Sequence, residues 1–179
     1  MTRETTQQFV AYYVRELLAG PKGIAAAIED LDDAQLHFRA HDNANSVGFD
    51  AWHVFRTADN IVHFAFYREQ PVWLAQGLDA AWGLPRNSQG TGMDPAEAHA
   101  LRFPSAVLLG RYGRDVADAI CPRIEAMTDD FLAEITRIQP HGELTRLLAL
   151  GTTILTHGYV HLGQINLART LLGRQSLDF

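Results

Sequence analysis

The chain has 179 residues, of which 47% are apolar and 20% are charged, so it is long enough to bury a substantial core as one domain. Its formal charge is -6, and no run of Lys or Arg occurs in it. Because nonspecific nucleic-acid binding depends on clustered cations, this composition argues against nucleic acid and anionic membranes as partners. We expect a single domain over residues 1–179.

Two features of the sequence argue against secretion. The start from Met1 to Gln8 is polar and shows no secretory signal, and the single cysteine, Cys121, has no partner for an internal disulfide. These features predict a cytoplasmic protein.

Two long helices, with a short one between them, are predicted in the first third of the chain. From Thr6 onward, Phe9, Tyr13 and Leu17 recur at four-residue spacing, which indicates an amphipathic helix that ends or kinks at Gly20-Pro21. A short helix over 24–31 follows. After a polar turn, Asn45 or Ser46 is a suitable N-cap for a second long helix that reaches about residue 67.

The rest of the chain predicts two more long helices. A short helix over 72–82 leads into a loop over 83–104, which contains several Gly and Pro residues, and a loop of this length in a compact domain is often functional. Ser105 is a suitable cap for a third helix, in which Pro122 predicts a kink. The segment 131–138 is ambiguous, strand-like but short. A fourth helix is expected from about Glu143 to Leu172, closed by Gly173.

Four long helices without a convincing strand pair predict an all-α fold, an antiparallel four-helix bundle with the long loop between the second and third long helices. The last helix has one charged side chain, Arg169, between Leu147 and Leu172, and a helix that is apolar nearly all round is normally buried. Its histidines, Gln164, Asn166 and threonines favour a core helix over a membrane span.

His157 and His161 lie four residues apart on this last helix, so both rings share one face. The spacing suits a metal site, but the glutamate of the zinc protease motif is missing. His53, on the inner side of the second helix, is the natural third ligand, and three imidazoles with an open position are typical of catalytic sites. The alternative is a set of hydrogen-bonded core histidines in a metal-free bundle.

Three further residues are candidates for supporting the site. Gln164 lies seven residues beyond His157 on the predicted inner stripe, and Asp50 is placed to orient a ligand imidazole, although a surface ion pair is an equal alternative for it. Trp82 borders the long loop and is a candidate to line a pocket near the metal. Core packing is the commoner role of tryptophan.

Two segments resemble the DinB-like metalloprotein superfamily. The stretch NSVGFDAWH, from Asn45 to His53, resembles the family's entry to the second helix, and HGYVHLGQI, from His157 to Ile165, resembles its element on the last helix. The resemblance implies a four-helix bundle in which His53, His157 and His161 bind a divalent metal, often within a homodimer. Many relatives have Arg where Leu162 stands here.

The resemblance also implies a range of functions. Characterised relatives include thiol-dependent S-transferases and isomerases that use low-molecular-weight thiols, so we expect a metal-dependent thiol transferase acting on a small-molecule substrate. The alternative is a noncatalytic metal- or ligand-binding stress-response protein. Imidazole ligands suit zinc or nickel, with iron or manganese as further options. The sequence does not choose the substrate.

Overall fold

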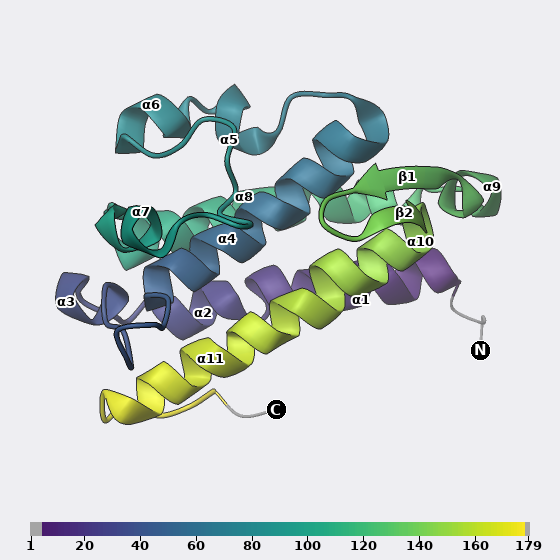
Figure 1. The fold of residues 1–179 in the computed structure, drawn as a ribbon. Coiled ribbons are helices and arrows are strands. Elements are labelled where there is room, and N and C mark those ends of the chain that lie inside the picture. The colour runs from purple at the N-terminus through teal and green to yellow at the C-terminus, as the bar shows by residue number, and fades with distance from the viewer. Residues whose placement is uncertain (1–4, 178–179) are drawn as a thin grey trace.

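The computed structural model describes residues 5–177, and four long helical segments dominate it (Figure 1). They are α1 (Thr6–Ala19), α4 (Val47–Asp59) with its continuation η1 (Asn60–Phe66), α8 (Ala106–Glu125), and the run formed by α10 (Arg146–Ala149), η2 (Leu150–Thr156) and α11 (His157–Leu171). The first packs on α8, and α4 packs on both α8 and α11. The core lies between these segments.

Hydroxyl caps set where all four of these segments begin, and Thr5 caps the first of them. The side chain of Ser46 accepts from the backbone N–H of Phe49, and Ser105 does the same for Leu108, so the second and third predicted helices start where the sequence indicated. The predicted start of the last helix at Glu143 is wrong. That residue lies in a strand, and the helix begins after Thr145, whose hydroxyl caps it.

Six short helices fill the connections. They are α2 (Ile24–Ile28), α3 (Asp33–Leu36), α5 (Val72–Ala75), α6 (Leu78–Trp82), α7 (Pro95–Ala100) and α9 (Asp129–Ala133). Three of them, α3, α7 and α9, were not predicted. The predicted helix over 72–82 is divided because Gly77 adopts a left-handed conformation with φ of 65°. The predicted loop over 83–104 contains α7, which Asp94 caps.

A two-stranded antiparallel sheet stands beside the helices. Strand β1 (Ile135–Ile138) pairs with β2 (Gly142–Thr145), and Ile135 lies opposite Thr145. Thr136 and Ile138 are buried and their neighbours are exposed, which is the alternation of a strand with one covered face. The fold is therefore mostly helical with one small hairpin, although the sequence showed no convincing strand pair.

The last helical segment is less buried than its composition predicts. Val160, Leu167 and Leu171 are more than half exposed, whereas Arg169, its one charged side chain, is 4% exposed. The guanidinium of Arg169 is buried because it donates to the Ala27 carbonyl and pairs with the Asp30 carboxylate. Within residues 5–177, no helix is both long and apolar enough to cross a membrane.

Candidate metal centre

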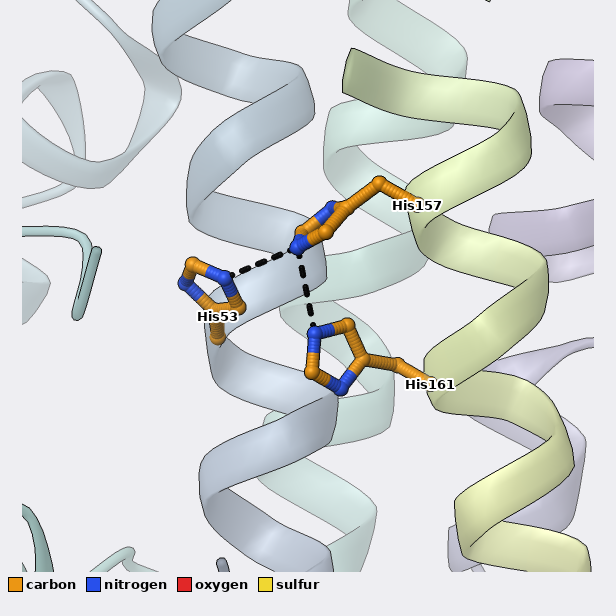
Figure 2. Close-up of side chains that lie close together, drawn as sticks. All are labelled: His53, His157 and His161. Atoms are coloured by element: carbon orange, nitrogen blue, oxygen red, sulfur yellow. Dashed lines mark hydrogen bonds between the residues drawn. The ribbon is translucent and has the colours of Figure 1, made fainter. Parts of the chain in front are cut away.

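Helices α4 and α11 bring three imidazole rings together (Figure 2). His53 projects from α4, and His157 and His161 project from the first two turns of α11. Nε2 of His157 lies 3.0 Å from Nε2 of His53 and 3.1 Å from Nε2 of His161. The three predicted ligands thus present nitrogen atoms to a common point, from segments more than a hundred residues apart.

A close approach of backbones makes this meeting possible. A Cβ atom at Gly158 would lie 2.4 Å from Leu17 Cδ2 and 3.3 Å from Val54 Cγ1, so only glycine lets α11 sit this close to α1 and α4. Gly163 differs, because a Cβ there meets nothing within 4 Å. Of the two glycines beside the histidines, Gly158 is therefore the packing residue.

The helix is also wound differently just before the site. Residues 150–156 form the π-helical segment η2, which ends at the residue before His157, and η1 continues α4 in the same way. Such segments are rare and occur often at functional sites. No feature of the sequence indicated them.

The neighbour of His53 fixes which ring nitrogen carries its proton. Nδ1 of His53 lies 2.5 Å from the backbone carbonyl oxygen of Gln89. A carbonyl oxygen only accepts, so Nδ1 donates and the neutral ring presents a lone pair at Nε2. Gly90, with φ of 95°, allows this contact, because a Cβ there would meet Phe49 at 2.8 Å and His53 Nδ1 at 3.3 Å. The long loop predicted to be functional thus orients a ligand.

Asp50 orients His161 in a comparable way. Its carboxylate is 5% exposed, accepts from the side-chain amide of Asn45, and has Oδ1 3.1 Å from Nδ1 of His161. This is an ion-pair distance without the alignment of a hydrogen bond. The negative charge favours a proton on Nδ1, so Nε2 of His161 is a lone pair as well.

These assignments leave the three rings with an unmet need. Nε2 of His157 can donate one proton at most, so at least one of its two close contacts sets one lone pair against another. Burial and the nearby rings of His161 and His53 lower the pKa of His157 to about 4, and burial also lowers the pKa of His53. An added proton is disfavoured here, and a cation that accepts lone pairs from all three rings satisfies them.

The spacing fits a transition metal. Nitrogen atoms that bind one zinc ion tetrahedrally at 2.0–2.1 Å are about 3.3 Å apart, close to the two observed separations. One ligand atom from each of the three histidines lies within 4.8 Å of the others. The donor set therefore suits a divalent metal and leaves a coordination position without a protein ligand among the described residues.

A cavity of about 190 Å³ adjoins two of the three rings. His53 and His157 line it, together with residues of α4, the long loop, the tip of the β1–β2 hairpin and η2. His141, at the hairpin tip, is the one titratable lining residue apart from these two ligands. No sequence pattern singles out His141, because a loop residue has no periodicity that predicts which element it contacts.

The other two predicted supporting residues lie apart from the rings. Gln164 is exposed on α11, since it is rotated about 20° from His157 away from the core, whereas Ile165 is rotated about 80° toward it. Trp82 is half-buried, stacks edge-on with Trp73 and Tyr112, and lines a different cavity beside α8. Neither residue lines the cavity next to the histidines.

The comparisons with known proteins agree with this architecture. A sequence profile of the DinB superfamily matches residues 16–165, a span that includes both histidine segments. The crystal structure of a conserved protein from Enterococcus faecalis superimposes with a TM-score of 0.81, covering 96% of this chain and 100% of that chain at 18% identity. That likeness shows the fold alone. No curated protein sequence matches significantly.

Proposed function

The chain belongs to the DinB superfamily, and we propose that it is a divalent-metal-binding enzyme, a thiol-dependent transferase with a metal held by His53, His157 and His161. The observation that carries the proposal is the convergence of three Nε2 atoms whose lone pairs have no sufficient partner among residues 5–177. Zinc or nickel suits the ligands best, with iron or manganese as alternatives. The four long helices are taken as the family's antiparallel bundle.

Each residue around the site has a defined task in this proposal. The Gln89 carbonyl and the Asp50 carboxylate hold protons on the Nδ1 atoms of His53 and His161, which keeps their Nε2 atoms free for the metal. When bound, the metal supplies a Lewis acid that lowers the pKa of a thiol or of water. Covalent transfer then needs a proton acceptor and a place for the substrate.

The cavity of about 190 Å³ supplies both requirements. Its volume suits the sulfur-bearing end of a low-molecular-weight thiol, and its wall contains Thr57, Thr153 and His141. His141 is placed to take the thiol proton, so that the sulfur electron pair forms the new bond to an electrophile while the electrophile's leaving group departs. Its location at the tip of a hairpin leaves it exposed and able to exchange that proton with water.

Elemental analysis after chelation and reloading tests the metal site. We expect one divalent ion per chain in the wild-type protein and none above background in the triple variant His53→Ala, His157→Ala, His161→Ala. Stoichiometric metal in the triple variant would place the site elsewhere.

An assay of catalytic turnover tests the proposed transferase activity. The reloaded protein is incubated with a panel of low-molecular-weight thiols and electrophiles, and we expect metal-dependent loss of free thiol with at least one pair. Metal binding without turnover of any pair would instead favour a noncatalytic metal- or ligand-binding protein of the stress response.

We further propose that the protein acts in the cytoplasm as a homodimer. Large apolar side chains are exposed on α1, including Phe9 and Tyr12, and on α11, including Val160, Leu167 and Leu171. Helices α1 and α11 contact each other, and contiguous exposed apolar surfaces are typical of sites that contact another protein. Sedimentation equilibrium of the wild type and of Leu167→Glu distinguishes a dimer from a monomer, and a wild-type monomer at all concentrations would contradict this proposal.

A further inference from the structure

A second and larger cavity lies beside the one next to the histidines. Its volume is about 410 Å³, within the range of small-molecule sites. The two cavities share Ile61, Gln89, Ile138 and Gln139 as lining residues, so they adjoin along one wall. A molecule with one end near the histidine triad thus has room for a further group in this direction.

The charged residues of this larger cavity are all cationic. Four arginines line it, and neither Asp nor Glu does, in a chain whose formal charge is -6. They come from α4, from the two loops that flank α5 and α6, and from β1: Arg56, Arg68, Arg86 and Arg137. Cations gathered from four separate segments in an acidic protein concentrate positive potential at one place.

Three of the four guanidinium groups have no carboxylate partner among the described residues. Arg86 pairs with Asp79 at 2.8 Å. Arg68 contacts only the ring of Phe64 through its side chain, and Arg137 has no ion pair or side-chain hydrogen bond within residues 5–177. Their charge is therefore available to a ligand.

Arg56 is the most informative member of this cluster. It is 1% exposed, its guanidinium lies over the ring of Trp73 at 5.0 Å, and it donates to the side-chain oxygen of Asn60 at 3.1 Å and weakly to two loop carbonyls. Its buried Nε has no hydrogen-bond partner. Asp59, one turn away, forms no direct ion pair with it, although the Tyr112 hydroxyl that donates to Asp59 also interacts with the Arg56 guanidinium.

Burying a guanidinium without a counter-ion is unfavourable unless an anion binds to it. Arginine also presents several N–H groups in a plane that matches the oxygens of carboxylate and phosphate. Burial, charge and cavity volume therefore favour the same kind of ligand, an oxyanion held between Arg56 and the more exposed arginines.

We propose that this cavity, called here the arginine cavity and defined by Arg56, Arg68, Arg86 and Arg137, binds the carboxylate or phosphate group of a small molecule whose other end reaches the histidine triad. The inference rests on the proposed function for the identity of that other end. It narrows the substrate of the triad to an acidic small molecule, and it assigns binding and orientation of the substrate to arginines that take no part in holding the metal.

Titration of the metal-free protein with inorganic phosphate and, separately, with succinate tests the proposal. Tryptophan fluorescence reports binding, because Trp73 stacks on Arg56, and calorimetry gives the affinity independently. We expect saturable binding of at least one of the two anions, weakened by added salt. The stronger anion identifies whether the natural ligand presents a phosphate or a carboxylate. Absence of saturable binding of both would overturn the proposal.

Substitutions locate the site. The double variant Arg68→Gln, Arg137→Gln removes two exposed cations and is expected to weaken anion binding about tenfold or more while leaving the far-UV spectrum unchanged. Arg56→Gln is expected to abolish binding, and its fold is checked in the same way. The matched control is Arg111→Gln, an exposed arginine that lines the separate cavity beside Trp82. Equal affinity in the double variant and the control would overturn the assignment to this cavity.

Metal and anion are measured separately, so their failures are distinguishable. Stoichiometric metal without anion binding would leave the proposed metal centre intact and refute the arginine cavity. Saturable anion binding by a wild-type protein that takes up no stoichiometric metal would support the arginine cavity and refute the metal centre.

Discussion

Two clusters that each include one histidine of the segment formed by α4 and η1 differ in how their polar atoms are satisfied. His63 donates to Asp59 at 2.8 Å, and Asp59 also accepts from the backbone of Val72 and Trp73 and from the hydroxyl of Tyr112. The ring and the carboxylate thus find their partners within the protein. The triad of His53, His157 and His161 instead sets Nε2 atoms against one another and leaves two buried Nδ1 atoms without a hydrogen bond.

This difference separates a structural cluster from a ligand site. The first cluster is buried, and the triad is buried at His53 and half-buried at His157 and His161. A carboxylate lies beside a histidine in each cluster, Asp59 in the first and Asp50 in the second. The number of satisfied hydrogen-bonding atoms distinguishes them. A cluster whose polar atoms all have partners stabilises the fold by itself, whereas a cluster with unpaired polar atoms needs a bound ligand to complete it. The two clusters are therefore expected to differ in their effects on metal affinity and on stability.

The largest contrast is expected in metal affinity. Replacing any one of His53, His157 or His161 by Ala removes a third of the donor set, so we expect the metal Kd to rise more than about 100-fold, beyond the loss typical of an indirect partner. His63→Ala is the matched control, a buried histidine of the same helical segment, and its Kd should stay within about twofold. Competition with a chromogenic chelator measures both, and equal losses would remove the distinction.

Stability should show the reverse contrast. Asp59→Ala leaves the Tyr112 hydroxyl, two backbone N–H groups and His63 without an acceptor, so we expect the free energy of unfolding to fall by about 3 kcal/mol or more. Metal stoichiometry should be retained. Urea denaturation of the metal-free protein measures the effect, with Asp118→Ala, which removes an exposed ion pair to Arg15, as a control expected within about 0.5 kcal/mol. A small effect of Asp59→Ala would contradict its role as an anchor.

Asp50 is expected to act through His161. Asp50→Asn keeps the shape of the side chain and removes its charge, so the preference for a proton on Nδ1 of His161 weakens. We expect metal affinity to fall about 10–100-fold with the ligands still in place. Chelator competition measures the change, and the spectrum of the cobalt-substituted protein should still report three nitrogen ligands. Unchanged affinity would show that Asp50 only holds the side chain of Asn45 at the start of α4.

Stability of the metal-free protein should depend on pH through the triad. Burial lowers the pKa of His157 to about 4, below its value of about 6.5 in the unfolded chain. As pH falls through this window the unfolded state takes up a proton that the folded state does not, so the free energy of unfolding decreases. Above about pH 6.5 this group contributes no slope. Urea titrations of wild type and His157→Gln measure it, and the same slope in both would assign the dependence to other groups.

The smallest effect is expected at Gln164. It is exposed and does not line the cavity next to the histidines. We expect Gln164→Ala to change metal affinity by less than about twofold. A larger loss in the chelator assay would show that this side chain acts on the site in a way that its position does not indicate.

The sequence identified all three members of the triad. His157 and His161 share a helix, so their spacing alone places both rings on one face, and the segment ending in His53 resembles a known family. It did not indicate the partners that come from loops. Gln89 contributes a backbone carbonyl, which no residue type reveals, and the approach of His141 depends on how the hairpin packs.

Errors about the elements have a similar origin. Glu143 was assigned to the last helix because propensity and polarity do not separate a short strand from a helix start, and the pairing of β1 with β2 decided it. Arg169 stands in an apolar stretch, and its burial depends on Asp30, far away in the chain. The burial of Arg56 likewise depends on tertiary contacts, because the sequence shows it only as one charged residue among several on a helix.

The local amino-acid sequence determined the long helices, most of their caps and the position of two imidazoles on one helix face, because these features depend on neighbours within a few residues. The tertiary structure alone decided which buried groups are satisfied. Tyr112 contacts Asp59, His53 contacts His157, and the Arg86 carbonyl contacts Arg56 from distant parts of the chain, so whether these polar groups have all their partners depends on three-dimensional contacts rather than on sequence spacing.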